Sequence, residues 1–470
     1  MGLDLNSFIR LIKQREIPDT WKDITQIKKE EVYLDSLVQK SSPPSIYGVT
    51  TLVGHLDKNK LNQDNIQDFQ SHLIKNHKIS LSRNYYSLFQ ATCILYVKLH
   101  HLNLGGTGVT STLYSHLLRI GEDESFQPKI PKESSYSSGD VIPAAHWASE
   151  VISYLGTKEK YQLKRKEGLT LINGSFVHVG LSIASYDRLV KLRNILLFNA
   201  IVFSHLYRPS QSVFYEGIPI KKNSRFHSIQ SLFNKYIVGH NKSVQDPVSV
   251  RAIPQVLDAF CSSMDHHKNT LGQVLNHRSD NPLIDEEYPF GLSQASFLEP
   301  KLTLSTSQMI DTLLMAGWNI ERRVHHLLSG NHKKIPANGT NKENELGMIQ
   351  LPKYITSLLE DSRKYGGVRS FANGSSTSYG IEDFWSYGLQ TDEILNTVLD
   401  NIEKILKIEI VIYMYCYNKF TRSEKFETLE SYMAQFEPSI LELEFEDYYS
   451  EVTKEDLLSF VPSLIDFENE

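Results

Sequence analysis

The feature that most constrains the fold is a helical repeat of apolar residues in the second part of the chain. Beyond about residue 180, apolar residues recur every three or four positions, which places them on one face of a helix. The repeats comprise Leu189, Leu192, Leu196 and Ala200; Met309, Ile310, Leu313, Leu314, Ile320 and Val324; and Ile394, Leu395, Val398, Leu399, Ile402, Ile405 and Leu406. Several helices of about 20 residues or more predict a helical bundle core.

The segment IEIVIYMY at 408–415 is rich enough in β-branched residues to form a strand, but it continues a helical register, so we favour a helix. The first third of the chain is more mixed and is interrupted by loop-like sequences rich in Gly, Ser and Pro. We therefore predict a mainly α fold in which a mixed first part is followed by long helices.

Composition narrows the classes of partner. The 470 residues are 40 % hydrophobic, enough for a large core, and 22 % charged with a net charge of −6. The sequence contains no run of Lys and Arg of the kind that binds nucleic acid. We therefore expect no nucleic-acid partner.

The cysteines are Cys93, Cys261 and Cys416, which are odd in number and far apart. They support neither a disulfide framework nor a cysteine-rich metal site, and they indicate a reducing compartment. The N-terminal sequence has no apolar core long enough for a signal peptide, and we find no apolar run of membrane-spanning length. We expect a cytoplasmic protein without a membrane partner.

Two other local patterns carry little functional information. Histidines are adjacent at 100–101, 266–267 and 325–326, but neighbouring side chains on a helix point in different directions and do not readily share a metal ion. The segment from Gly105 to Gly108 lacks the spacing of a phosphate-binding or dinucleotide-binding loop. We predict no metal site and interpret the glycine-rich segment as a turn.

The segment KESSYSSGDVIPAAH at 132–146 is more specific. It resembles the signature Gly-Ser-x-Gly-Ala-Ser-Gly-Asp-Leu-Ala-Pro-Leu-Ala-His of the histidine, phenylalanine and tyrosine ammonia-lyase family. The shared positions are Ser138, Gly139, Asp140, Pro143, Ala145 and His146.

Further blocks resemble the same family in the same order. The stretch IYGVTTLVG at 46–54 resembles the mobile loop, KEGLTLING at 166–174 matches closely, and VQDPVSVRAIPQV at 244–256 matches the Gln-Asp-x-Tyr-Ser-x-Arg block. NHRSDNPL at 276–283 and TSYGIEDFWSYG at 377–388 complete the series. The resemblance covers most of the chain, and on it the chain is identified as a member of this family.

The resemblance implies a cofactor made from the backbone. In the family, the nitrogen of the signature glycine attacks the carbonyl of the first triad residue, and two waters are lost to give 4-methylidene-imidazol-5-one. Here the triad is Ser137-Ser138-Gly139. Glycine permits the tight backbone, Ser138 supplies the oxygen that is eliminated, and Ser137 replaces the usual Ala, of which only the carbonyl is consumed.

The resemblance also implies roles for other residues. The amine of an amino acid substrate adds to the methylidene carbon and becomes a leaving group, while Tyr47 removes the β-proton as general base. Arg251 binds the substrate carboxylate through two hydrogen bonds, and Asn173 and Gln245 complete the polar surroundings.

Substrate selectivity in the family is associated with a residue pair after the mobile loop and with a later acidic or amide position. Histidine lyases carry Ser-His with Glu, whereas tyrosine and phenylalanine lyases carry His-Leu or Phe-Leu with Gln. Here LIKNHKIS at 73–80 aligns Asn76 and His77 with the pair, and Glu382 is the acidic variant. A polar, anionic pocket suits imidazole better than phenyl, so we favour a histidine-like substrate.

Several positions depart from the family pattern. Val248 replaces a second active-site tyrosine, Leu52 and Val53 replace the Gly-Phe of the mobile loop, Tyr136 replaces a glycine and Phe384 a histidine. Three functions therefore stay open: a lyase acting on an unusual polar amino acid, an aminomutase of specialised metabolism, and a non-catalytic descendant that binds or assembles.

The resemblance implies the mainly helical ammonia-lyase architecture, with an N-terminal cofactor and lid region at 1–180, a central helical bundle at 181–425 and a C-terminal cap at 426–470. It also implies a homotetramer whose active sites take residues from three chains. Long helices with extensive apolar faces are consistent with such an assembly, since those faces need partners to bury them.

Overall fold

The computed structural model describes residues 2–133, 135, 139–218, 224–237, 244–332, 334–366 and 376–454. The fold is mainly α, as predicted, and divides into two compact units. Unit 1 comprises Met1–Asp187, His267–Thr306 and Ser370–Glu393, and unit 2 comprises Arg188–His266, Ser307–Arg369 and Ile394–Glu470. Each unit is discontinuous in sequence, whereas the division expected from the sequence used consecutive segments.

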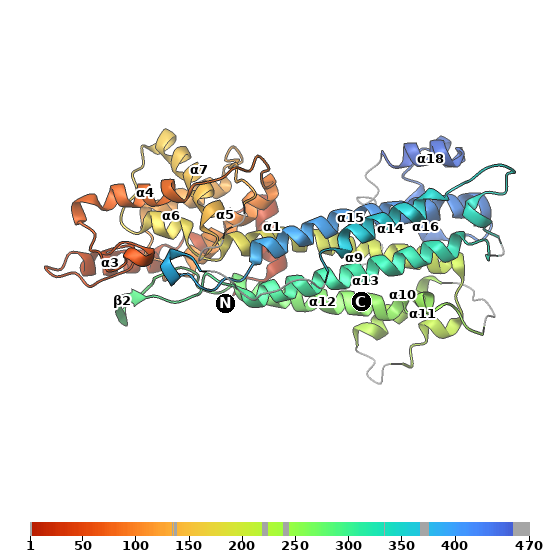
Figure 1. Ribbon diagram of the computed structural model, residues 1–470, viewed down its shortest axis with the longest axis horizontal. Coiled ribbons are helices and arrows are strands. Elements are labelled where there is room, and N and C mark those ends of the chain that lie inside the picture. The colour runs from red at the N-terminus through yellow and green to blue at the C-terminus, as the bar shows by residue number, and fades with distance from the viewer. Residues whose placement is uncertain are drawn as a thin grey trace. The chain divides into compact units, whose positions relative to one another are not determined.

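Unit 1 contains short helices joined by loops, together with one small hairpin (Figure 1). Its α-helices are α1 (Leu5–Gln14), α2 (Asp19–Lys22), α3 (Thr25–Val38), α4 (Ile66–His77), α5 (Leu88–Asn103), α6 (Ser111–Glu122), α7 (Val141–Glu159) and α8 (Glu167–Ile172). Three 3-10 turns are η1 (Gly54–Leu56), η2 (Gln63–Asn65) and η5 (Ser378–Gly380). Strands β1 (Leu283–Asp285) and β2 (Tyr288–Leu292) pair antiparallel.

Side-chain caps fix where several of these helices begin. At the start of α5, the Ser87 hydroxyl accepts a hydrogen bond from the Gln90 N–H. The Gln90 side chain in turn accepts a hydrogen bond from the Ser87 N–H, and this reciprocal pattern is a capping box. Thr110 caps α6 by accepting from the Leu113 N–H at 3.1 Å. The side chains of α5 from Ala91 to Leu102 are all buried, on every face of the helix. Helix α5 therefore lies in the core of unit 1.

The boundaries at 187/188, 266/267, 306/307 and 393/394 each fall within a long helix. These helices are α9 (Phe176–Tyr207), α12 (Ile253–Leu275), α13 (Pro300–Leu328) and α15 (Gly388–Cys416). The helix favoured for 408–415 is confirmed, because that segment lies within α15. Our expectation of no apolar run of membrane-spanning length was wrong. Residues 167–207 are long and apolar enough by composition, and 83 % of the most apolar window is buried inside the protein. A buried core helix meets the same criterion.

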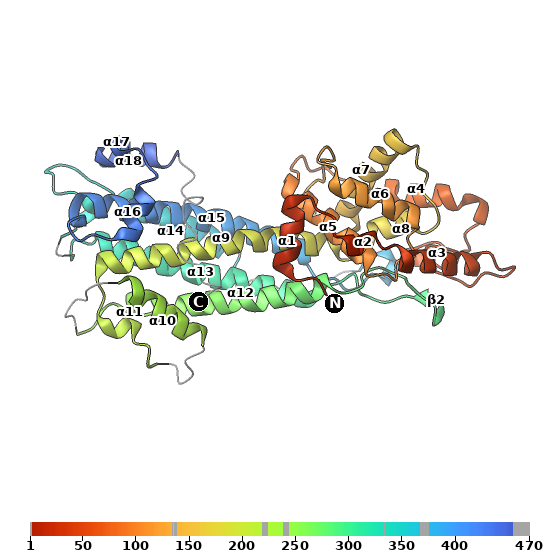
Figure 2. The same ribbon diagram turned by 180° about the vertical axis from the view of Figure 1, so that it is seen from behind.

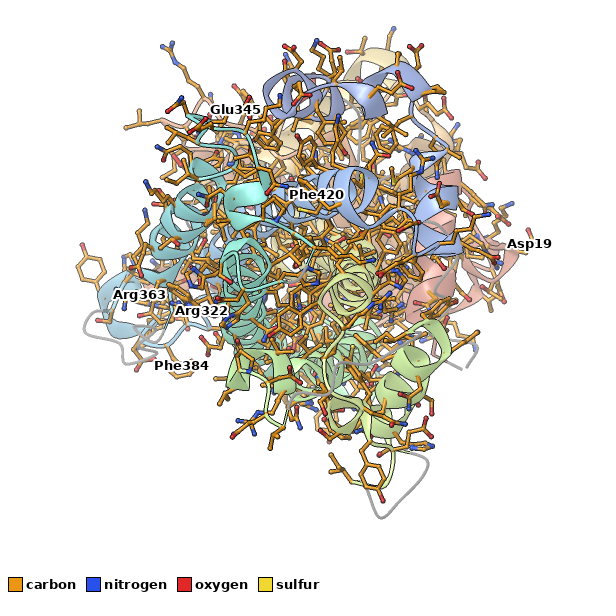
Figure 3. All side chains as sticks on the ribbon, turned by 90° about the vertical axis from the view of Figure 1, so that its right-hand side faces the viewer. Asp19, Arg322, Glu345, Arg363, Phe384 and Phe420 are labelled. Carbon is orange, nitrogen blue, oxygen red and sulfur yellow. The ribbon has the colours of Figure 1, made fainter. Side chains whose placement is uncertain are left out.

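Unit 2 contains the remaining helices, which include α10 (Arg225–Tyr236), α11 (Val248–Arg251), α14 (Gln350–Arg363), α16 (Glu427–Met433), α17 (Pro438–Glu442) and α18 (Phe445–Val452). Shorter turns are η3 (Gln211–Phe214), η4 (Ala337–Gly339) and the π-helical η6 (Tyr417–Thr421). Figure 3 shows Arg322 of α13 and Arg363 of α14 on the outer surface, where both side chains are more than half exposed.

The core of unit 2 contains a buried ion pair. Arg323 of α13 donates to Glu409 of α15 at 2.7 Å, and both side chains are almost completely buried. Tyr413 donates to the same carboxylate at 2.6 Å, and Asn199 of α9 donates to its second oxygen at 3.0 Å. These hydrogen bonds compensate for the loss of water around the buried charges.

Candidate active site

A cavity of about 710 Å³ lies within unit 1, lined mainly by loops and helix ends. Of the residues to which the sequence analysis assigned a catalytic or binding role, five line this cavity: Tyr47, Asn76, His77, Asn173 and Glu382. They come from four segments that are far apart in the chain. The volume is in the range of small-molecule binding sites.

Tyr47 is positioned by a tight turn. Gly48 has a φ of +65°, and a Cβ there would meet the end of the Leu169 side chain at 2.5 Å, so any other residue would be strained at this position. The fully buried Gln70 side chain donates to the Gly48 carbonyl at 3.0 Å and accepts from the Leu169 N–H at 3.0 Å. Gln70 thereby fastens the Tyr47 turn to α8.

The surroundings of Tyr47 favour the neutral phenol. Burial raises its pKa above the ordinary value, whereas a hydrogen bond from the Gly54 N–H at 2.9 Å lowers it. The nearby carboxylates of Glu382 and Asp57 raise the pKa further because they repel a phenolate. A base at this position therefore needs positive charge from another group.

Asn76 and His77 are the last residues of α4, which packs against α7 and α8 (Figure 2). His77 Nδ1 lies 2.7 Å from the Leu73 carbonyl oxygen. Because a carbonyl only accepts, Nδ1 carries the hydrogen, and the neutral imidazole keeps an acceptor at Nε2.

Asn173 follows directly after α8 and is 6 % exposed. Its Oδ1 accepts from the Gly174 N–H at 2.8 Å, and its Nδ2 donates to the Asn281 carbonyl at 2.7 Å. One N–H and one lone pair of the amide have no partner among the described residues and can bind a ligand. Gly174 has a φ of +106°, and a Cβ there would lie 2.8 Å from the Ser279 carbonyl oxygen.

The glycine of the cofactor triad lies against Asn173. Gly139 has a φ of +83°, and a Cβ there would lie 3.1 Å from Asn173 Oδ1 and from the Gly174 backbone. The next residue, Asp140, precedes α7, and burial raises its pKa to about 7. Ser137 and Ser138 lie outside the described residues. The described surroundings thus fit a group built from this triad, which needs a glycine with a close, permissive backbone.

Glu382 is held by a short antiparallel bridge to Thr377. The Thr377 hydroxyl donates to a Glu382 carboxylate oxygen at 2.7 Å. The same region contacts the loop after Tyr47, because the rings of His55 and Tyr379 are 4.5 Å apart. The bridge therefore keeps the Glu382 carboxylate beside that loop.

The sequence did not point to several other lining residues, among them Asp57, Gln294 and Phe297. Asp57 lies ten positions after Tyr47, and this closeness in sequence could have suggested that it lies near the cavity. No motif or spacing in the sequence points to Gln294 or Phe297. Asp57 and Glu382 are the formally charged residues among the described lining side chains, and no Lys or Arg is among them. The lining is therefore anionic.

Gln245, Val248 and Arg251 belong to unit 2 and are not among the described residues that line the cavity. Val248 begins α11 and is 70 % exposed. Arg251 Nε donates to the Asp246 carbonyl at 2.9 Å, and the Asn319 side chain donates to the Ser249 carbonyl at 2.8 Å.

Comparison with known proteins supports the sequence pattern. The aromatic amino acid lyase family matches residues 3–434. A probable histidine ammonia-lyase from Thermoplasma acidophilum is 26 % identical over 421 residues, which cover 84 % of this chain and 83 % of that protein.

Solved structures share the fold at lower identity. Tyrosine aminomutase from Streptomyces globisporus is similar with a TM-score of 0.84 and 20 % identity, covering 98 % of this chain and 97 % of that one. Histidine ammonia-lyase from Trypanosoma cruzi is similar with a TM-score of 0.80 and 18 % identity, covering 98 % and 93 %. From the family match over most of its length, the chain belongs to the aromatic amino acid lyase family.

Proposed function

We propose that this protein is an ammonia-lyase that makes methylidene-imidazolone from Ser137-Ser138-Gly139 and eliminates ammonia from a histidine-like L-amino acid. The observation that carries the proposal is the cavity in which Tyr47, His77, Asn173 and Glu382 meet, with Gly139 packed against Asn173. The alternatives are an aminomutase of specialised metabolism and an inactive descendant that binds or assembles.

Each of these residues has its own role in the elimination of ammonia. The methylidene-imidazolone, when formed, supplies an electrophilic carbon for the substrate amino group. Among the described residues, one N–H and one lone pair of the Asn173 amide have no partner, and they can orient that amino group. Tyr47 accepts the β-proton as the C–N bond breaks, so that the products are ammonia and an α,β-unsaturated acid.

The lining of the cavity supports a polar substrate side chain. Glu382 contributes a carboxylate to the lining, and leaving that carboxylate unpaired beside a phenyl ring would be costly. The His77 Nε2 is an acceptor in the neutral tautomer and can bind a polar N–H. An imidazole, or another side chain with N–H donors that can carry positive charge, can donate both to the Glu382 carboxylate and to His77 Nε2.

We propose a cytoplasmic homotetramer in which a neighbouring copy supplies Gln245, Val248 and Arg251 to each cavity. Arg251 would bind the substrate carboxylate, and its charge would favour the Tyr47 phenolate. What supports this proposal is that none of these three residues is among the described residues of their own chain that line the cavity. The three cysteines are free and buried, which is compatible with a reducing compartment.

The function is tested by intact mass and by product analysis. We expect the mass of the purified chain to fall short of the sequence mass by two waters. In a scan of amino acids, a lyase releases free ammonia and an absorbing unsaturated acid, whereas an aminomutase returns a β-amino acid. A full-length mass together with no product from any amino acid would contradict the proposal and favour the inactive descendant.

The substitution Glu382→Gln should shift the substrate preference toward less polar side chains. The amide keeps the shape and still accepts from Thr377, but it removes the negative charge that pairs with a polar substrate. The ratio of kcat/KM for histidine to that for phenylalanine should fall by roughly tenfold, equivalent to about 1.4 kcal/mol. Glu345→Gln, at an exposed position of unit 2, serves as the control. An unchanged ratio would show that Glu382 does not face the substrate side chain.

The substitution Val248→Tyr should raise the rate on histidine, because it restores the hydroxyl that the family pattern carries there. A positioned acid–base group contributes on the order of 10² to 10⁴ in rate, and part of that gain is expected. Val248→Phe adds the ring without the hydroxyl and should not accelerate the reaction. Equal rates for the two variants would mean that the site uses another hydroxyl or different chemistry.

A further inference from the structure

A buried lysine lies behind the candidate active site. Lys98, in the second half of α5, is 1 % exposed, and its ammonium donates to the Asn173 main-chain carbonyl at 2.9 Å. The same ammonium lies over the Phe176 ring, 4.4 Å from its centroid. Phe176 begins α9, so Lys98 contacts both sides of the Asn173–Gly174 turn.

No acid pairs directly with this charge among the residues that the structure describes. The nearby Asp280 already accepts from Lys166 at 2.7 Å and from Thr170 at 3.1 Å, all in a buried environment. Burial lowers the pKa of Lys98 to about 8, while Asp280 opposes this shift and Lys166 adds to it. A buried ammonium that relies on one carbonyl and one ring is costly for the fold, so stability alone does not account for it.

The turn that Lys98 holds is the surface on which the triad glycine packs. Asn173 Oδ1 and the Gly174 backbone are the closest atoms to a Cβ built on Gly139, at 3.1 Å. On the opposite side, Gly174 lies against the Ser279 carbonyl, which a Cβ would meet at 2.8 Å. The turn is thus enclosed by Gly139, Ser279 and the Lys98 ammonium, and a shift of its carbonyl would move the Gly139 contact.

We propose that Lys98 is a positioning residue for self-processing: its ammonium fixes the Asn173 carbonyl, and thereby the turn against which Gly139 must lie when its nitrogen closes on Ser137. The inference rests on the proposed function, since it requires that the triad cyclises. In that step the Gly139 nitrogen bonds to the Ser137 carbonyl carbon. The carbonyl oxygen leaves as one water with the amide hydrogens of Gly139 and Ser138, and a C=N double bond forms between that carbon and the Ser138 nitrogen. The Ser138 hydroxyl leaves with the Cα hydrogen of Ser138 as the second water.

The test compares intact masses of the full-length protein. Lys98→Met keeps the length of the side chain and removes the charge and the donor. We expect it to fold but to lose the deficit of two waters in most chains, whereas the wild type carries it in nearly all. His101→Leu, one turn along the same buried helix, alters a similarly buried polar side chain with no hydrogen bond to Asn173, and should process fully.

Thermal unfolding of both variants separates positioning from general destabilisation. If the Met variant processes like the wild type, the Lys98 inference is wrong while the proposed function stands. A wild-type chain without the deficit overturns both. If the Met variant does not fold, Lys98→Gln replaces it, since it keeps a neutral N–H donor. A folded Gln variant with a reduced deficit supports the role of the charge, and one with the full deficit excludes it.

Discussion

Replacing Ser138 by alanine is expected to restore the full sequence mass and to abolish ammonia release. Alanine lacks the hydroxyl that leaves with the second water, so the exocyclic methylene cannot form. Because the electrophile would be lost, the variant should lose most of the rate enhancement, roughly 10⁶-fold or more if the enzyme accelerates its reaction as typical enzymes do. Intact mass and an ammonia assay with the best substrate measure both effects.

Ser137→Ala is the matched control, since it removes a hydroxyl from the neighbouring position. Only the carbonyl of residue 137 is consumed in the proposed cyclisation, so this variant should keep both the mass deficit and the activity. If Ser138→Ala retained the deficit of two waters, the triad would have been assigned to the wrong residues.

The substitution Tyr47→Phe should lower kcat/KM by about 10² to 10⁴, the range for loss of a positioned general base. The ring remains to fill the turn, and the change removes the hydroxyl that accepts from the Gly54 N–H. Tyr33→Phe removes the hydroxyl of a half-buried tyrosine outside the cavity, which donates to the Glu286 carbonyl, and should leave the rate unchanged. A Tyr47→Phe rate within a few-fold of the wild type would exclude Tyr47 as the base.

The same residue predicts a dependence on pH. A base works in its deprotonated form, and burial with nearby carboxylates raises the pKa of Tyr47 above its usual value of about 10. The wild-type rate should therefore increase as pH rises from neutral toward that pKa, and the increase should be absent in Tyr47→Phe. Asp57→Asn should move the rise to lower pH, because it removes one of the charges that disfavour the phenolate.

The long helices could be predicted because their apolar spacing is a local property of the sequence. The segment at 408–415 shows the strength of that signal: its β-branched residues favour a strand, yet the helical register of α15 continues through it. Local patterns were less informative about α9, whose apolar composition alone cannot distinguish a buried core helix from a membrane span.

Residues of the site that belong to family-like blocks could be placed from the sequence, and those outside such blocks could not. Tyr47, Asn173 and Glu382 stand in blocks with a recognisable order, and all three line the cavity. Lys98 and Phe297 stand in no such block. The hydrogen bond from Lys98 to Asn173 joins residues 75 positions apart, and only the tertiary fold brings them together.

The ion pair between Arg323 and Glu409 limits how this protein can change by mutation. Removing one partner of a buried pair costs roughly 3 to 5 kcal/mol, whereas replacing both by apolar residues of similar volume is often neutral or even favourable. Glu409 also accepts hydrogen bonds from Tyr413 and Asn199, so its loss would leave the Tyr413 hydroxyl without this acceptor and remove one acceptor of the Asn199 amide. Evolution by single steps would have to pass through an intermediate less stable than either end point. Mutant libraries that vary positions 323 and 409 one at a time will therefore find both intolerant, and only simultaneous variation can reach an apolar core there.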